Sequence, residues 1–345
     1  MSVHNIVPIS TNSGFKAIEI HHDDLSQLGW KVDVIVISAF SGNYSPIEGT
    51  LIHSLESNCD IVVRELFDSR LYDFRESLNT WVSQKIENNA FSYLICLEGM
   101  HYNANNENLL EAQLQDLLAV ISVLQQKGIS VNTIALPFLG TGLQGVNVNV
   151  VMPLLIKKSK ELLETIHSVQ TVYFVHPNIE YIEFINNEIN TLLHRTPDRL
   201  EKLRQNSDIA ANLDVIYLKL NQLKSQYGWN AVNSIDELSR RIIQDDIRFY
   251  ELGILTRRAM EAILKSVIKS DSFMTLSQMV KELHRFKLST WMLSYMHTLR
   301  TFGNFLAHDS EVENAEKQMT KDDVLFFIKA LERFIEIISN HCNQL

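Results

Sequence analysis

The residues that interrupt regular structure are divided so unequally along this chain that they predict two different folds in one polypeptide. All six prolines and nine of the twelve glycines lie in residues 1–197. The net charge also differs between the two parts. Residues 1–197 carry 11 basic and 21 acidic side chains, whereas residues 198–345 carry 20 of each. Proline and glycine interrupt helices and form turns. We therefore expect an α/β domain over 1–197 and an all-α domain over 198–345.

The overall composition narrows the class of protein. A chain of 345 residues, 46% hydrophobic and 21% charged, has the balance of a globular protein with two domains. The formal net charge of −10 argues against a protein that coats nucleic acid and leaves room only for a local site. The three cysteines are widely spaced, and there is no long apolar run or signal-peptide pattern. We therefore expect a cytoplasmic protein without disulfides, metal site, cofactor or membrane contact.

Strand-like and helix-like runs alternate along residues 1–197. The run VDVIVI at 32–37 is apolar at nearly every position, as in a strand covered on both faces. Such alternation predicts an α/β sandwich with a mixed or mainly parallel sheet. The expected strands are 15–20, 32–37, 91–97, 133–136 and 171–175, and the expected helices are 49–55, 69–85, 108–126 and 148–168.

Residues 198–345 show helical patterns throughout. The apolar positions of 324–338 recur at intervals of three and four, so this helix packs on one face. The apolar faces of 290–307 and 324–338 exceed what one short bundle must bury, which predicts a homodimer or a higher homo-oligomer. The expected helices are 198–226, 234–268, 276–286, 290–307 and 321–340.

A glycine-rich loop, ALPFLGTGLQG, occupies residues 135–145 between an expected strand and an expected helix. Glycines in this position let backbone N–H groups approach a phosphate closely, and the dipole of the following helix adds to the attraction. A plain turn would have the same sequence, so the pattern alone leaves both interpretations open. No Lys-Ser/Thr pair follows the loop, which excludes an ATP-hydrolysing P-loop.

The order of these segments resembles a macro domain, the fold that binds ADP-ribose and related nucleotides. Residues 22–25 (HDDL) and 32–36 (VDVIV) resemble the opening of that family, and residues 137–145 (PFLGTGLQG) resemble its second phosphate loop. The resemblance covers about residues 14–190 and implies an α/β/α sandwich. In it, an aspartate accepts a hydrogen bond from the adenine amino group, glycines hold the pyrophosphate and an aromatic residue lies by the distal ribose. The ligand-binding residues that it implies are Asp24, Leu25, Gly140, Thr141, Gly142, Leu143, Gly145 and Phe174.

The chain departs from the macro-domain pattern where active members carry asparagines. Residues 38–41 read Ser-Ala-Phe-Ser instead of Asn-Ala-Ala-Asn. The departure implies a reader or sensor of the nucleotide and disfavours hydrolysis of ADP-ribose conjugates. For Asp24, a helix cap is the alternative to a ligand contact.

The most unusual local string of the second half runs from Leu299 to His308, LRTFGNFLAH. Arg300, Asn304 and His308 stand at intervals of four and form one slowly rotating polar stripe on a helix. A histidine can take the proton from a ribose 2′-hydroxyl, and an arginine can hold the phosphate of a phosphodiester. A buried Arg–Asn–His network that ties helices together would look the same in sequence. Gly303, inside the helix, predicts a close approach of two helices or a bend.

Residues of about 240–345 resemble a HEPN-type helical domain, in particular a bacterial family with an Arg-x-x-Gly-Asn-x-x-Ala-His helix. The string from 299 to 308 matches that helix, and residues 257–264 resemble an earlier helix of the family. Many HEPN domains are dimeric, metal-independent ribonucleases, which implies catalytic roles for Arg300, Asn304 and His308. Their Arg and His are usually separated by four to six residues, whereas seven separate them here.

Together these features predict a sensor–effector. A macro-like domain binds an ADP-ribose-type or cyclic nucleotide, and it controls a HEPN-like domain that cuts RNA in bacterial anti-phage defence or stress. The alternative is a non-enzymatic reader or scaffold, in which the helical domain only dimerises or recruits.

Overall fold

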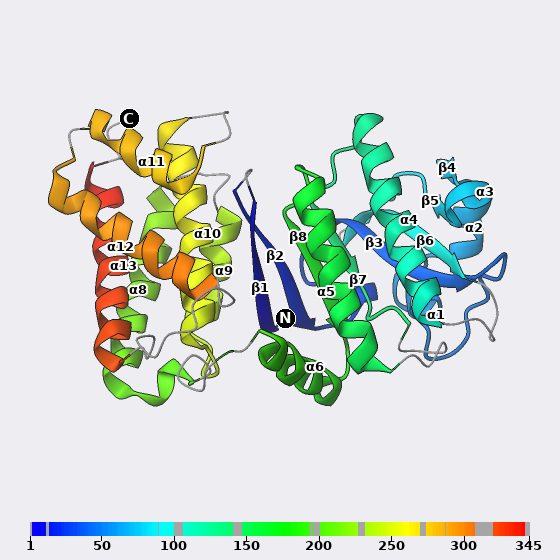
Figure 1. Cartoon of the computed structure of the whole chain (residues 1–345), viewed down its shortest axis with the longest axis horizontal. Helices are drawn as coiled ribbons and strands as arrows, with labels where there is room; N and C mark the ends of the chain where they lie inside the picture. Colours follow the sequence, from blue (N-terminus) through cyan, green and yellow to red (C-terminus); the bar gives the residue numbers. More distant parts are fainter. Residues whose placement is uncertain are drawn as a thin grey trace. The chain divides into compact units, whose positions relative to one another are not determined.

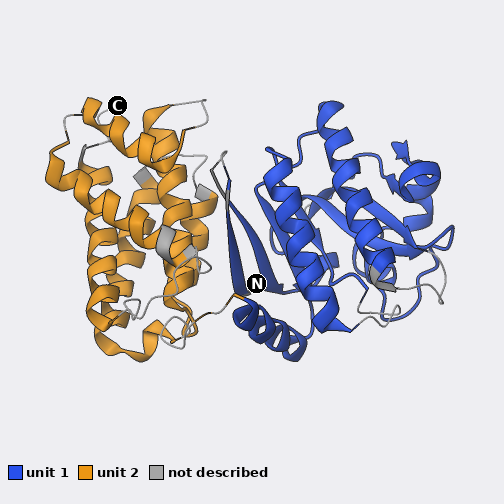
Figure 2. Ribbon diagram, viewed as in Figure 1, with its two compact units in different colours: residues 1–11, 16–192 blue, residues 12–15, 193–345 orange. Residues whose placement is uncertain are grey.

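The computed structural model divides the chain into two compact units, residues 1–11 with 16–192 and residues 12–15 with 193–345 (Figure 2). It describes residues 2–11, 14–88, 90–99, 106–140, 147–193, 195, 201–226, 232–269, 274–286, 288–307 and 320–341. The first unit contains the β-sheet and the described part of the second is helical (Figure 1), so the expected succession of an α/β and an all-α half is confirmed. The expected boundary at 197 stays a prediction.

The first unit is built on one sheet with the strand order β1-β2-β8-β7-β3-β6-β5-β4. Neighbouring strands from β2 to β6 pair in parallel, and β5 and β4 add an antiparallel edge. The strands are β1 (Ser2–Thr11), β2 (Gly14–His22), β3 (Val32–Phe40), β4 (Tyr72–Asp73), β5 (Thr80–Val82), β6 (Phe91–Gly99), β7 (Thr133–Leu136) and β8 (Thr171–His176). All five expected strands are therefore confirmed, as is the mixed, mainly parallel sheet.

Helices cover both faces of this sheet. On β3, Ile35 and Ile37 belong to a core cluster with residues of α1 (Leu51–Cys59) and α2 (Val63–Asp68). Side chains alternate along a strand, so the equally buried Val34 and Val36 face the opposite layer. That layer consists of α4 (Asn106–Gln126), α5 (Val148–Thr165) and α6 (Ile179–Leu192), which contact one another in this order. The three-layer sandwich buries strands on both faces, as the apolar run at 32–37 predicts.

The expected helix at 69–85 is wrong. This segment contains β4, a short helix α3 (Arg75–Leu78) and β5. Burial decides the outcome, because Trp81 is fully buried, pairs with Cys96 of β6 and contacts the rings of Tyr44 and Phe67. Asp73 holds the turn by accepting hydrogen bonds from the guanidinium groups of Arg70 and Arg75.

Strand β1 and helix α6 are among the elements of the first unit that were not expected from the sequence, as is α2. In the case of β1 and α6, no helical or strand-like run was recognised at 2–11 or 179–192. These two elements are tied together by buried amides, since Nδ2 of Asn5 donates to Oδ1 of Asn186 at 2.7 Å and to Oδ1 of Asn190 at 3.1 Å. The bonded residues are separated by 181 and 185 positions in the sequence. A local hydrophobic pattern cannot reveal a contact over such a distance.

The second unit is a helical assembly over its described residues. Its elements are η2 (Leu203–Gln205), α8 (Ser207–Gln226), α9 (Val232–Ile242), α10 (Phe249–Ile268), α11 (Leu276–Glu282), η3 (Leu283–Phe286), α12 (Thr290–Ala307) and α13 (Lys321–His341). The expected single helix at 234–268 is wrong, because the chain turns between α9 and α10. Arg241 bonds Asp246 inside the turn and Glu251 beyond it, and Glu251 also accepts the N–H of Arg248 that begins α10. Within the described part of the chain, no helix is long and apolar enough to span a membrane.

Helices α10 and α12 pack closely against each other at Gly253 and Gly303. A Cβ added to Gly303 would lie 3.1 Å from Cβ of Arg257 and 3.5 Å from the carbonyl oxygen of Gly253. A Cβ added to Gly253 would collide with the side chain of Leu306. The close approach predicted at Gly303 is therefore confirmed, and it places Arg257 beside α12.

Candidate functional site

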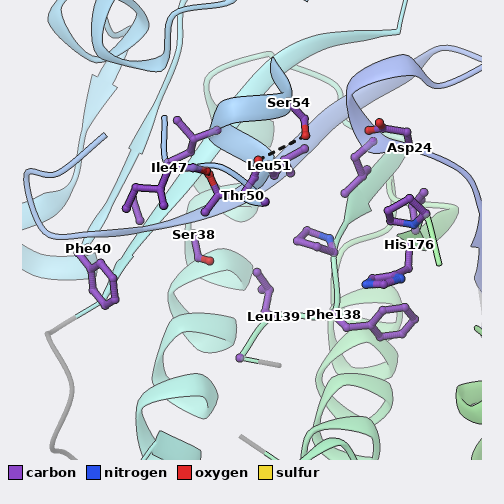
Figure 3. A pocket seen from close by; sticks show the side chains of 18 of the residues that line it. Asp24, Ser38, Phe40, Ile47, Thr50, Leu51, Ser54, Phe138, Leu139 and His176 are labelled. Atoms are coloured by element: carbon purple, nitrogen blue, oxygen red, sulfur yellow. Dashed lines mark hydrogen bonds between the residues drawn. The ribbon is translucent and has the colours of Figure 1, made fainter. Parts of the chain in front are cut away.

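A cavity of about 310 Å³ opens in the first unit where β3, β7 and β8 end (Figure 3). In an open α/β sheet, ligands bind beyond the carboxyl ends of parallel strands, where the strand order reverses. Helix α1, which follows β3, begins at the same cavity. The lining consists of residues 24 and 25 after β2, 38–40 of β3, 43, 45 and 47 of the next loop, 49–52 and 54 at the start of α1, 137–140 after β7 and 175–177 at the end of β8.

Asp24 lies at the rim of this cavity (Figure 3). Its Oδ1 accepts hydrogen bonds from the N–H of Ser26 at 2.8 Å and from the Oγ–H of Ser26 at 2.7 Å, so Asp24 caps η1 (Leu25–Gln27). The cap alternative is therefore confirmed. Its other oxygen, Oδ2, has no hydrogen bond within the described residues, and a contact of Asp24 with an adenine amino group stays a prediction. Leu25, the neighbour of Asp24, is buried and also lines the cavity.

The N-terminus of α1 forms the opposite part of the lining. Thr50 is the N-cap residue, and its Oγ1 accepts the N–H of His53 at 3.3 Å and donates to the carbonyl of Ile47 at 2.6 Å. The first amides of a helix have no acceptor within the helix, so those of Leu51 and Ile52 are available at the cavity. Together with the helix dipole they favour an anion such as a phosphate.

The glycine-rich loop enters the cavity through residues 137–140. Gly140 has φ of 86°, in the left-handed region that side chains rarely adopt, so glycine is required at this turn. Thr141, Gly142, Leu143 and Gly145 lie outside the described residues, and their contacts with a pyrophosphate stay a prediction. Beyond the loop, α5 begins at Val148, with Asn147 as its N-cap.

Phe174 does not line the cavity. It is fully buried in β8 and stacks on Phe138 with ring centroids 5.4 Å apart. His176, at the end of the same strand, does line the cavity, together with the rings of Phe40 and Phe138. Its Nδ1 accepts the N–H of Asn178 at 3.1 Å, which places the proton of the neutral ring on Nε2, and burial lowers its pKa. Sequence reasoning missed His176 because the apolar run ends one residue earlier.

The end of β3 and the first residues after it line the cavity without the family's asparagines. Ser38 stands in the place of the first asparagine and Phe40 in the place of an alanine, and the Ser38 hydroxyl points toward the cavity (Figure 3). Sequence reasoning named both residues as departures and did not include them in the site. Strand alternation could have revealed them, because residues 38 and 40 lie on the same side of β3 and both reach the cavity.

In the second unit the structure describes only part of the expected catalytic stripe. Arg300 lies on α12, is half-buried, and its Nε has no hydrogen-bond partner among the described residues. Asn304 belongs to α12, but its side chain lies outside the described residues, as does His308 entirely. The catalytic roles of the three residues therefore stay a prediction. Among the described residues no group of three or more His, Cys, Asp or Glu is arranged to hold a metal ion.

Comparison with known proteins gives matches of structure only. No protein-family model and no curated protein matches the sequence. The chain is similar to a single-site variant of the Oceanobacillus iheyensis macrodomain, with 14% identity and a TM-score of 0.44 over 56% of this chain and 100% of that one. It is similar to the same macrodomain solved with ADP, with 14% identity and a TM-score of 0.39 over 57% of this chain and 100% of that one. It is also similar to a Trypanosoma brucei macrodomain in complex with ADP-ribose, with 12% identity and a TM-score of 0.38 over 50% of this chain and 68% of that one.

Proposed function

We propose that residues 16–192 bind an ADP-ribose-type or cyclic nucleotide in the cavity at the ends of β3, β7 and β8. The observation that carries the proposal is the composition of the lining. A carboxylate acceptor at Asp24 lies on one side, and the free amides of α1 with the turn at Gly140 lie on the other. The first suits an adenine amino group and the second a pyrophosphate. Ser38 and Phe40 bring no amide side chain to the end of β3, which favours reading the nucleotide over hydrolysing its conjugates.

Asp24 provides the sharpest test of this site. Titration calorimetry is expected to show binding of ADP-ribose and about tenfold weaker binding of its hypoxanthine analogue, which lacks the amino donor of adenine. Asp24→Ala should remove this preference, since no carboxylate is left to accept the hydrogen bond. Asp24→Asn keeps the cap of η1 and serves as the control for folding. Equal binding of both nucleotides by the wild type would exclude the proposed role of Asp24, and absence of binding would exclude the nucleotide site.

We further propose that residues 193–345 form a HEPN-like, metal-independent ribonuclease that the nucleotide controls, in bacterial anti-phage defence or stress. His308 takes the proton of a ribose 2′-hydroxyl, whose oxygen attacks the adjacent phosphorus. The bond between phosphorus and the 5′-oxygen breaks, and this oxygen leaves as a hydroxyl after taking a proton from solvent water, while the protonated His308 returns its proton to the solvent. The product is a 2′,3′-cyclic phosphate. Arg300 holds the phosphate and Asn304 positions the pair. The string at 299–308 and its resemblance to HEPN domains support this assignment, and a homo-oligomer would bring two such sets together.

A fluorescent RNA reporter tests the ribonuclease in the presence of each nucleotide. His308→Ala and Arg300→Ala are each expected to lower the cleavage rate by roughly 10²- to 10⁴-fold, the usual contribution of a general base or a charge-stabilising group. Thr301→Ala, an exposed position on the same helix, is the control. Nucleotide binding without cleavage in the wild type would support the alternative function, a non-enzymatic reader or scaffold.

A further inference from the structure

Helix α11 contacts both α12 and η3, and basic side chains of these three elements lie near His297 of α12. Burial lowers the pKa of His297, and Arg300 of α12, Lys281 of α11 and His284 of η3 lower it further. Lys281 and His284 are exposed, whereas His297 and Arg300 are half-buried. The group therefore extends from the surface into the contact between helices.

Arg257 of α10 extends this group inward. The glycine contact places it beside α12, and the nearby charge of Arg300 contributes to lowering its pKa, after the larger effect of burial. Its side chain is 11% exposed and forms an ion pair with Glu261 at 3.5 Å. A second acid of this region, Glu282, already pairs with Arg285 at 2.7 Å.

These charges are not balanced within the described residues. Arg257, Arg300 and Lys281 are basic side chains, and Glu261 is the carboxylate that pairs with Arg257. The Nε of Arg300 is buried without a hydrogen-bond partner in the described part of the chain. A buried guanidinium donor without an acceptor is unfavourable, and a phosphate oxygen satisfies such a donor especially well.

We propose that Arg257, Lys281, His284, His297 and Arg300 form a binding site for the phosphate groups of single-stranded RNA. After Glu261 pairs with Arg257, the positive charges of Arg300 and Lys281 remain. These two charges match the negative charges of two adjacent phosphodiesters and exceed the charge of one. Lys281 and His284 contact the RNA sugar–phosphate backbone at the protein surface, and Arg300 binds the phosphate that lies deepest in the site. The site goes beyond the proposed cleavage, because four of its five residues lie outside the string at 299–308.

The test measures binding separately from cleavage. The probe is a labelled 2′-O-methyl oligouridylate, which has no 2′-hydroxyl to react, and the readout is fluorescence anisotropy with the full chain at several salt concentrations. Lys281→Gln combined with His284→Gln should weaken binding about tenfold and reduce the slope of log affinity against log salt by about one to two. Lys329→Gln on α13, which removes an exposed cation paired with Glu332, is the matched control and should change affinity less than about twofold.

The pH dependence gives a second readout. Arg300, Lys281 and His284 disfavour the protonated ring of His297, and a bound phosphate would offset this repulsion. The affinity for RNA should therefore rise as the pH falls through the lowered pKa of His297. In His297→Gln this rise should be smaller. No binding by the wild type, or equal weakening by Lys329→Gln, would overturn the proposal. Full competition by an equal concentration of inorganic pyrophosphate would assign the site to a free phosphate compound instead. Binding without cleavage of ordinary RNA would support this site and contradict only the proposed ribonuclease.

Discussion

Arg241→Met is expected to lower the free energy of unfolding of the helical unit by about 3–5 kcal/mol, the cost of breaking a buried ion pair from one side. Arg241 is 3% exposed and donates from Nη2 to Glu251 at 2.7 Å, while Glu251 is 0% exposed. After the substitution the Glu251 carboxylate would remain buried without its ion-pair partner, and it would keep only neutral donors among the described residues, the N–H of Arg248 and, at 3.5 Å, the hydroxyl of Tyr250. Urea denaturation of the full chain, followed by circular dichroism of the helices, measures the change.

Arg240→Met supplies the matched control, because Arg240 is the exposed neighbour on the same helix. We expect it to change the free energy of unfolding by less than about 0.5 kcal/mol. Adding Glu251→Gln to Arg241→Met should recover a large part of the loss, since the amide keeps an acceptor for Arg248 and carries no charge. A loss that Arg240→Met reproduces would contradict the assignment to the buried pair.

Ser38→Trp is expected to weaken ADP-ribose binding by more than about 100-fold, or about 2.7 kcal/mol. Ser38 ends in the cavity, and an indole in its place would occupy the volume that the ligand needs (Figure 3). Titration calorimetry measures the affinity, and thermal denaturation checks that the variant is folded.

Ser57→Trp makes the same exchange on the exposed face of α1, outside the cavity lining. It should bind ADP-ribose as the wild type does. If a folded Ser38→Trp also retained the affinity of the wild type, the ligand would have to bind elsewhere on the protein.

The central strands could be predicted from the sequence because burial on both faces leaves an apolar run that needs no knowledge of neighbours. The edge of the sheet could not. Residues 69–85 carry a mixed pattern, and their conformation depends on the packing of Trp81 against Phe67 and Tyr44, two rings that lie outside the segment. Similarly, the break between α9 and α10 depends on the hydrogen bonds of Arg241 to Asp246 and Glu251. The hydrophobic periodicity of the segment carries no information about these bonds.

The candidate site could be predicted in part. Asp24, Leu25 and Gly140 were named from the resemblance and line the cavity, since each lies in the loop that follows a strand of the parallel sheet. Phe174 was named too, but a strand residue can point only to one of two faces, and its face is filled by Phe138. A helix was expected from residue 49, but its cap at Thr50 was not named from the sequence, and its place at the cavity follows only from the order of strands in the sheet.

The glycine contact between α10 and α12 also limits how the helical unit could be regulated. An added Cβ at Gly303 would press on Arg257 and on the backbone of Gly253, so a rotation or slide of one helix past the other would have to open this contact. Moving Arg257 away from Arg300 therefore costs packing energy. In the control that we propose, the elements that can shift without opening this contact are α11 and η3, which carry Lys281 and His284.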